Sequence, residues 1–300
     1  MSELQPMVDA HHHAFDITQV DYPWLTGAPI KAHFGPYEKI HGKSYTIEDY
    51  RRDIAKQNVV KSVHVEAGAN PKQAERETGW LQAQADVHGF PHGIVAYANL
   101  SDPDVGRVLD SHCRHRNMRG VRMMTKRPSD LAGKLDASGS LMSDAQWRRG
   151  FAMLAERRLS FDLQAPSPLM AEAAALAQAF PRSQIILTHA GLPLDRTPEG
   201  RIAWRAGMKR MAERPNIALK ISGIPMTDWT WTTESLRPIV LESVDLFGPA
   251  RTMFGSNFPI DGLYTSYDTL FNAYREIIAG FSDVEQRAML HDNAIRYYRL

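Results

Sequence analysis

MVDAH, residues 7–11, is the first of eight short runs rich in valine, isoleucine and leucine that recur along the 300-residue chain. The other seven runs are VVKSVHVEA (59–67), GIVAYANL (93–100), RGVRMM (119–124), LSFDLQA (159–165), QIILTHA (184–190), NIALKISG (216–223) and RTMFGS (251–256). Apolar runs of this length are typical of buried strands. Periodicity alone does not distinguish such strands from short buried helices, so the segments between the runs must decide between strand and helix.

Those intervening segments carry helix signals. TIEDYRRDIAKQN (46–58) opens with Thr46 and has Asp49 three residues later, which is a capping-box pattern. DAQWRRGFAMLAERR (144–158) and TPEGRIAWRAGMKRMAER (197–214) place apolar residues three and four apart. SPLMAEAAALAQAF (167–180) is alanine-rich and stops before Pro181. This alternation predicts parallel strands joined by helical crossovers.

Eight such units in 300 residues predict an α/β fold, a (β/α)8 TIM barrel. A doubly wound open sheet is the runner-up, but no glycine-rich phosphate turn follows the first run. No linker with a shift in composition divides the chain, so we expect a single domain over residues 1–300. The long segment from Asp16 to Ser44 is rich in prolines and aromatic residues. We expect this first loop to lie over the barrel mouth as a substrate lid.

The charge balance limits the partners. With 35 basic and 34 acidic residues, nothing indicates a nucleic-acid or membrane partner, and a small-molecule substrate is expected. The single cysteine, Cys113, excludes an internal disulfide framework. The N-terminal segment lacks the features of a signal peptide, and no apolar run is long enough for a membrane span, so we expect a cytoplasmic protein. The oligomeric state stays open, a homo-oligomer included.

A barrel of this kind carries its chemistry at the carboxyl ends of its strands. That rule gathers His11, His13, Glu66, Arg122, Gln164, His189, Lys220, Asn257 and Asp261, with His64 deeper and Arg119 on the fourth run. His11 and His13 are two apart and share a face, so His12 points away and is expected to be structural. Three histidines and a water are typical ligands of a catalytic zinc. Asp9 is expected to orient a neighbouring histidine.

Several motifs together resemble the amidohydrolase superfamily, in particular its amidohydrolase-2 branch near the sugar-lactone and muconolactone hydrolases. They are VDAHHHAFD, DYPWL, ILTHAGLP, NIALKISG, RTMFGSNFPID and NAIRYYRL, and they follow one another over nearly the whole chain. The resemblance implies a (β/α)8 barrel and hydrolysis, often metal-assisted. It matches His11 and His13 to a metal-binding pair, and His189 to a histidine that binds metal or polarises the substrate carbonyl.

The chain departs from the family pattern at three positions. Arg122 stands where many members have lysine or glutamate, and Gln164 stands where a histidine is common. Asn257 replaces the aspartate that usually acts as general base, and a carboxamide cannot accept a proton at neutral pH. Asp261, His189 and Glu66 remain as candidate bases. Without the aspartate we expect at most one divalent metal, zinc or manganese, bound weakly by His11, His13 and His189.

The leading hypothesis is therefore a hydrolase that opens a lactone or similar cyclic ester of a small sugar-acid or carboxylated substrate. We expect catalytic roles for His189, Asn257, Asp261 and Arg122, and substrate contacts from Lys220, Trp24, Glu66 and Gln164. Arg122, Lys220 and Arg119 would make the barrel mouth basic. The alternatives are a non-oxidative decarboxylase or hydratase of a carboxylated ring on the same barrel, and a non-catalytic binding protein.

Overall fold

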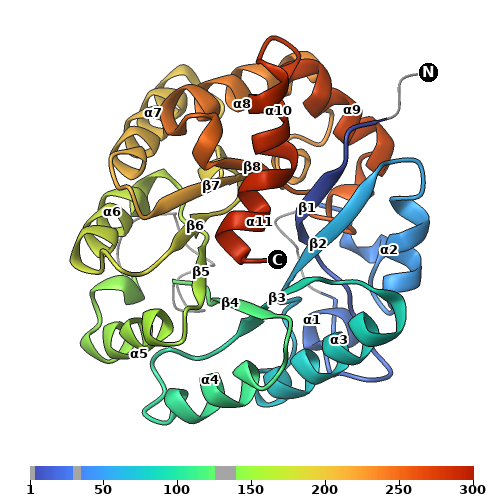
Figure 1. The fold of residues 1–300 in the computed structure, drawn as a ribbon, viewed down its shortest axis with the longest axis vertical. Coiled ribbons are helices and arrows are strands. Elements are labelled where there is room, and N and C mark those ends of the chain that lie inside the picture. The colour runs from blue at the N-terminus through green and yellow to red at the C-terminus, as the bar shows by residue number, and fades with distance from the viewer. Residues whose placement is uncertain (1–3, 30–34, 126–139) are drawn as a thin grey trace.

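The computed structural model describes residues 4–29, 35–125 and 140–300. Its eight strands are parallel and neighbour one another in chain order from β1 to β8. They are Met7–His12 (β1), Val59–Val65 (β2), Gly93–Tyr97 (β3), Met118–Arg122 (β4), Ser160–Leu163 (β5), Ile185–Leu187 (β6), Ile217–Ile221 (β7) and Thr252–Phe254 (β8). The predicted (β/α)8 barrel is confirmed, and all eight predicted runs contain a strand (Figure 1).

Helices surround the strands on the outside of the barrel, apart from the C-terminal helix, which lies over one end (Figure 1). They are Pro23–Thr26 (α1), Ile47–Asp53 (α2), Ala74–His88 (α3), Val105–Cys113 (α4), Ala145–Glu156 (α5), Met170–Ala179 (α6), Pro198–Ala212 (α7), Thr233–Phe247 (α8), Tyr267–Ile278 (α9), Asp283–Arg287 (α10) and Asn293–Tyr298 (α11). Across the described ranges, no helix is long and apolar enough to cross a membrane.

The helix starts follow the predicted capping chemistry. Thr46 and Asp49 form a complete capping box at α2, with each side chain bonded to the other residue's backbone amide. The side chains of Asp144 and Thr197 accept hydrogen bonds from the first turns of α5 and α7. Several strands are shorter than their apolar runs. β6, for example, ends at Leu187, because the backbone turns into a left-handed segment at His189 and Ala190.

The barrel closes where β1 meets the segment just after β8. The backbone amide of Asn257 donates to the carbonyl of His11 (2.7 Å), and that of His13 donates to the carbonyl of Phe258 (2.7 Å). Gly255 lies in this seam, and a Cβ atom there would be only 2.6 Å from the Cβ of His11. Glycine is therefore required for the two backbones to approach each other.

One end of the barrel is filled by apolar side chains and covered by the C-terminal helix α11, which lies across the strands (Figure 1). Val8, Val63, Val95 and Met253 from the strands pack with Tyr298 of α11. This is the amino-terminal end of the strands. It leaves the carboxyl ends for chemistry, as in other barrels of this class.

The seam provides a test of the fold. We expect Gly255→Ala to lower the free energy of unfolding by at least about 1–3 kcal/mol, the usual cost of overpacking, because the new methyl group meets rigid backbone. Urea unfolding measures the change. Gly280→Ala is the matched control, since a Cβ there meets nothing within 4 Å, and its effect should stay within about 0.5 kcal/mol. Equal stability of both variants would contradict the closure described here.

Candidate functional site

Three imidazoles meet at the carboxyl end of the barrel. The ring centroid of His11 lies 5.0 Å from that of His13 and 4.7 Å from that of His189. His11 belongs to β1, His13 follows it, and His189 comes directly after β6 and Thr188. All three side chains are buried. The structure thus brings together the three histidines that the sequence selected.

An irregularity in β1 gives these side chains their directions. Asp9 pairs with Ser62 and His12 with His64, so β1 uses one more residue than β2 over this interval. An extra residue of this kind is a β-bulge, a feature that re-aims side chains beside active sites. His12 points away from the cluster, stacks on Tyr50 at 4.0 Å and shares a hydrogen bond with Ser62 Oγ. The structural role predicted for His12 agrees with these contacts.

His64 also has a structural environment. Its Nε2 lies 3.1 Å from the carbonyl oxygen of Ala14, and burial holds its pKa well below the ordinary value. Its ring lies beside those of His12 and His13 but is not part of the cluster formed by His11, His13 and His189. His64 therefore supports the backbone that follows β1.

His189 is held by an unusual turn. His189, Ala190 and Leu192 have φ values of 55°, 50° and 49°, a region that is costly for residues with side chains. The ring of His189 lies against Gly223, where a Cβ would be 2.4 Å from Nδ1. Nδ1 also shares a 3.0 Å hydrogen bond with Ser222 Oγ. The strained turn and the missing Cβ together fix the direction of the ring.

Arg122 and Glu66 form a buried ion pair at the ends of β4 and β2. Arg122 Nε donates to Glu66 Oε1 (2.7 Å), and a second guanidinium nitrogen donates to the Glu66 carbonyl oxygen (2.6 Å). The other carboxylate oxygen accepts from the backbone amide of Gly68 (2.8 Å). These contacts engage both Glu66 oxygens, so Glu66 is poorly suited to act as a general base. Its structural role is to hold the guanidinium beside the imidazoles.

Lys220 lies inside the barrel. Its side chain is 0% exposed and donates to Asp162 Oδ2 (2.6 Å), and Nζ lies 3.4 Å from His11 Nδ1. The phenol of Tyr298 donates to both Asp162 oxygens (2.9 and 2.8 Å). Lys220 is thus engaged by Asp162 inside the barrel, and its predicted contact with substrate stays a prediction.

Asn257 and Asp261 face each other after β8. The Asn257 amide nitrogen donates to Asp261 Oδ1 (3.1 Å), while Asp261 Oδ2 is buried without a hydrogen bond among the described residues. Asn257 has a φ of 56°, a conformation that asparagine tolerates better than most residues. Burial raises the pKa of Asp261 to about 8, and the hydrogen bond from Asn257 only partly opposes this.

Burial has the opposite effect on the imidazoles. It lowers the pKa of His13 to about 3 and holds the pKa of His11 and His189 well below the ordinary value. The cations Arg122 and Lys220 add to the lowering for all three rings. The cluster is therefore composed of neutral imidazoles at pH 7, each with one donor and one acceptor nitrogen.

An apolar layer covers part of the mouth. Leu192, Met226 and Ile260, from the loops after β6, β7 and β8, pack with Trp24 and Ile40 of the first loop. The indole nitrogen of Trp24 donates to the Ala67 carbonyl oxygen (2.8 Å), beyond the end of β2. The first loop therefore reaches across the mouth, as predicted. Trp24 and the half-buried Gln164, which follows β5, stay candidate substrate contacts.

The predicted metal site needs ligands that suit a cation. The nitrogen His11 Nε2 is buried without a hydrogen bond, as a ligand awaiting a metal would be. However, the ring's other nitrogen faces the Lys220 ammonium, whereas a metal-bound histidine usually donates its second N–H to a carbonyl or carboxylate. Within the described part of the chain, no group of three His, Cys, Asp or Glu side chains is arranged to hold a metal. The donor set fits a metal poorly.

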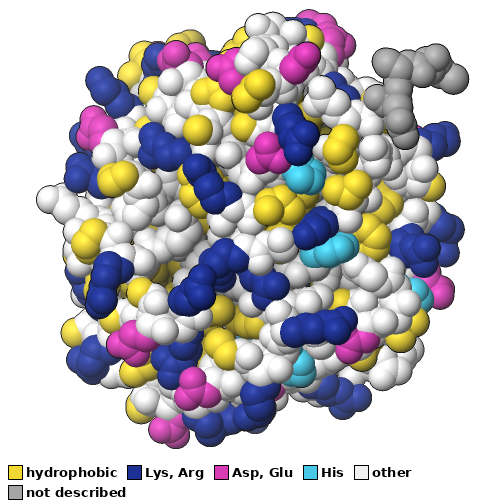
Figure 2. Space-filling view, in the orientation of Figure 1, with side chains coloured by type: hydrophobic (Ala, Val, Ile, Leu, Met, Phe, Trp, Pro, Cys, Tyr) yellow, Lys and Arg dark blue, Asp and Glu magenta, His cyan; other side chains and the backbone are white. Residues whose placement is uncertain are grey.

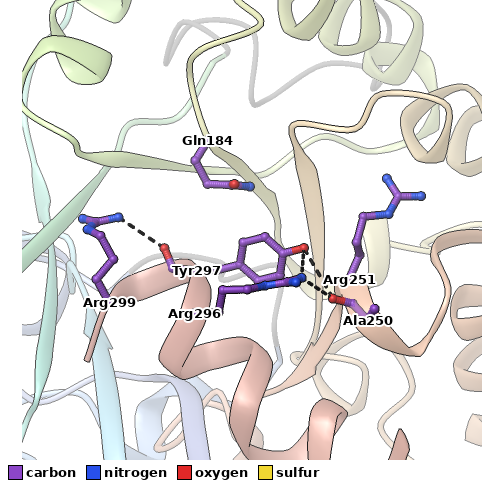
Figure 3. A pocket seen from close by; sticks show the side chains of 6 residues that line it. All are labelled: Gln184, Ala250, Arg251, Arg296, Tyr297 and Arg299. Atoms are coloured by element: carbon purple, nitrogen blue, oxygen red, sulfur yellow. Dashed lines mark hydrogen bonds between the residues drawn. The ribbon is translucent and has the colours of Figure 1, made fainter.

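Figure 2 shows the opposite end of the barrel, where many Lys and Arg side chains lie on the surface. Arg119 lies here, donating to the carbonyls of Arg299, Arg116 and Met118, so the prediction that it makes the mouth basic is wrong. It sits at the start of β4, and Arg122 at its end. A pocket at this end is lined by Gln184, Ala250, Arg251, Arg296, Tyr297 and Arg299 (Figure 3). It lacks a carboxylate or imidazole and lies away from the histidines.

Sequence reasoning missed two residues of the site. Asp162 lies two positions before Gln164 on β5, and the same strand rule that selected Gln164 places it on the inward face. Its pairing with Lys220 was not foreseen, since an aspartate in a strand gives no signal of its partner. Tyr298 comes from α11, and only the folding of the chain end under the barrel brings its phenol to Asp162.

A barrel with this histidine cluster at its mouth defines the class of protein, and the chain belongs to the amidohydrolase family, whose model matches residues 8–300. It is 45% identical over 300 residues to the uncharacterized protein y4mH of Sinorhizobium fredii (strain NBRC 101917 / NGR234), covering 100% of both chains. It is 25% identical to an L-fucono-1,5-lactonase of Burkholderia multivorans (strain ATCC 17616 / 249), covering 98% of this chain and 96% of that one.

The fold is also similar to a crystal structure of an amidohydrolase from Burkholderia multivorans with bound zinc. The TM-score is 0.83 at 23% identity, and the match covers 99% of this chain and 100% of that chain. This likeness supports the barrel architecture along the whole sequence. The zinc belongs to that protein.

Asp261 gives this site a testable pH dependence. Its folded pKa of about 8 lies above its ordinary value of 3.8, so the fold favours the protonated carboxyl. Its stabilising contribution is therefore full below about pH 4 and is lost as the pH rises through about 8. We expect Asp261→Asn to flatten this decline in the free energy of unfolding, measured by urea titration from pH 5 to about 9.

Asp245→Asn is the control, because the Asp245 side chain is 70% exposed. It should retain the decline of the wild-type protein. A wild-type and an Asp261→Asn curve that run parallel over the whole pH range would show that Asp261 keeps an ordinary pKa in the folded chain.

Proposed function

We propose that this protein is a hydrolase that opens a lactone or similar cyclic ester of a small polar substrate, with a sugar-acid lactone as the first candidate. The observation that carries the proposal is the buried site itself, where three neutral imidazoles lie beside the Arg122–Glu66 pair and the Asn257–Asp261 pair. The similarity to an L-fucono-1,5-lactonase over nearly the full chain supports this substrate class.

Each group has a proposed role in the water attack on the lactone carbonyl. Arg122 and His189 stabilise the oxyanion that forms as the water oxygen bonds to the carbonyl carbon. Asn257 orients the water, since its amide is held by Asp261. The carbonyl then re-forms, the ring C–O bond breaks, and the leaving alkoxide takes the proton that Asp261 accepted from the water, which gives a hydroxy acid.

Of the three candidate bases, Asp261 fits best. Glu66 is engaged by Arg122 and Gly68, and the pKa of His189 is lowered well below the ordinary value, which makes its imidazole a weak base. Asp261 has a pKa of about 8 and an oxygen, Oδ2, without a hydrogen-bond partner in the described chain. A base with a pKa near the working pH is the most effective. We therefore assign proton acceptance to ionised Asp261.

A divalent metal bound by His11, His13 and His189 was predicted from the sequence, with zinc or manganese as the ion. A bound metal would polarise the carbonyl as a Lewis acid. Because the Lys220 ammonium faces His11 Nδ1, the mechanism proposed here uses hydrogen bonds from this chain's own residues and routes no step through a metal.

The structure also bears on the alternatives. A decarboxylase or hydratase of a carboxylated ring was to hold carboxylates with Arg122 and Lys220, and of these two cations Lys220 is already matched by Asp162 inside the barrel. Arg119 lies at the other end of the barrel. Against a non-catalytic protein stand the three imidazoles gathered at the carboxyl end of the barrel. Lactone hydrolysis therefore remains the leading proposal for the function of this protein.

Activity tests the assignment directly. We expect hydrolysis of L-fucono-1,5-lactone or a related aldonolactone, followed by acid release, to exceed that of a simple alkyl ester. Asn257→Ala should lower kcat by about 10²-fold, the scale of one lost oxyanion or orienting group. Asn58→Ala is the control, because the Asn58 amide bonds Leu4 near the start of β1, away from the mouth. Unchanged kcat in Asn257→Ala would remove Asn257 from the mechanism.

The base assignment has its own test on the same substrate. We expect kcat of the wild-type protein to rise with pH through about 8 as Asp261 ionises. Asp261→Asn should lower kcat by about 10²–10⁴-fold, the range for general base catalysis, and should remove this rise. A variant that keeps both its rate and its pH profile would show that another group accepts the proton.

A further inference from the structure

His11 and His13 look alike in the sequence but meet different partners. The Nδ1 atom of His13 lies 2.8 Å from the carbonyl oxygen of Val65, which can only accept a hydrogen bond. His13 therefore carries its proton on Nδ1, and its Nε2 presents a lone pair on the side of the ring that meets the Asn257 side chain. The Nδ1 atom of His11 instead lies 3.4 Å from the Nζ atom of Lys220.

Burial lowers the pKa of Lys220, and the charge and hydrogen bond of Asp162 oppose this lowering. Asp162 accepts hydrogen bonds at both oxygens, from Lys220 and from the phenol of Tyr298. Nζ also lies 5.0 Å from the centroid of the Tyr298 ring, a cation–π contact. The charge of Lys220 is thus matched by a carboxylate and a ring face.

An ammonium group has three donors and no acceptor. An N–H on His11 Nδ1 would point at this cation, so the ring must present its Nδ1 lone pair to Lys220 and carry its proton on Nε2. The Nε2 atom of His11 is also the one that is buried without a hydrogen-bond partner among the described residues. Its N–H is therefore directed into the site and available to a ligand oxygen.

We propose that Lys220 is a positioning residue, anchored by Asp162 and Tyr298, that fixes His11 as a hydrogen-bond donor while Val65 fixes His13 as an acceptor. The His-x-His pair is then a donor–acceptor pair and not a pair of metal ligands, since both ligands would need an Nε2 lone pair. Under the proposed function, on which the catalytic part rests, His11 donates a hydrogen bond to the carbonyl oxygen of the lactone. His13 accepts a hydrogen bond from the attacking water, whose proton passes to Asp261.

The arrangement connects the chain end with the site. Tyr298 of α11 holds Asp162 on β5, Asp162 holds Lys220 on β7, and Lys220 faces His11 on β1. Each link is buried, so the tautomer of His11 is set by contacts that no substrate touches. Paired buried charges contribute little to stability. The Lys220–Asp162 pair is therefore better explained by its effect on the tautomer of His11.

The tautomers can be measured on the unmodified protein. In the chain labelled with ¹⁵N-histidine, long-range ¹H–¹⁵N correlation spectra distinguish a protonated Nε2 from a protonated Nδ1. We expect His11 to be protonated on Nε2 and His13 on Nδ1, with signals assigned by their loss in His11→Gln and His13→Gln. A His11 ring protonated on Nδ1 would overturn the proposal, whatever the activity of the protein.

A variant tests Lys220 itself. Lys220→Met keeps the length of the side chain but removes the donor, and Lys220→Met combined with Asp162→Asn avoids leaving a buried carboxylate unpaired. Circular dichroism establishes that the double variant folds. We expect its His11 ring to populate both tautomers, and its affinity for Zn²⁺, measured by titration calorimetry, to rise by about tenfold or more because Nε2 can then act as a ligand.

Unchanged His11 tautomers in a folded double variant, or wild-type Zn²⁺ binding as tight as that of the variant, would contradict the proposal. The kinetic readout is a fall in kcat of about 10²-fold, the scale of one oxyanion donor, with little change in KM. Asp245→Asn is the control for surface charge. If the spectra show the expected tautomers but no lactone is hydrolysed, the proposed function fails while the role of Lys220 in fixing the tautomer stands.

Discussion

The carboxylate of Asp9 joins the first strand of the barrel to the segment that follows the last strand, and the site depends on that junction. It accepts hydrogen bonds from the amide and hydroxyl of Ser256 (2.8 and 2.7 Å) and from the amide of His11 (3.1 Å). The phenols of Tyr50 and Tyr267 add two more, at 3.0 and 3.1 Å. A fully buried carboxylate would be costly without such donors. The same contacts place His11 and Asn257 opposite each other across the seam.

The interior of the barrel is organised by pairs of opposite charge. Glu66 holds Arg122, and Asp162 holds Lys220, so two cations lie beside the imidazoles without an exposed counter-charge. Burial and these cations keep the histidines neutral, while burial alone pushes the pKa of Asp261 upward. The site thus separates neutral hydrogen-bonding groups from one carboxyl that titrates near pH 8, as expected where acid and base roles are divided.

The sequence predicted the framework well because strand and helix signals are local. The capping box of Thr46 and Asp49 and the alternation of apolar runs with helices depend on neighbours in the chain. The strand-end rule also gathered His11, His13 and His189 correctly, since it needs only the order of the strands. It was wrong for Arg119, because a strand of five residues separates two ends with different surroundings.

By itself the sequence determined the barrel, the family pattern and the replacement of the usual aspartate by Asn257, all of which follow from residue types and spacing. Tertiary structure alone decided which charges are paired, because the partners of Lys220 lie 58 and 209 positions away along the chain. It also decided which atom faces the Nδ1 nitrogen of each histidine in the pair. That atom is a carbonyl oxygen at His13 and an ammonium nitrogen at His11, and no local pattern of residues encodes this difference.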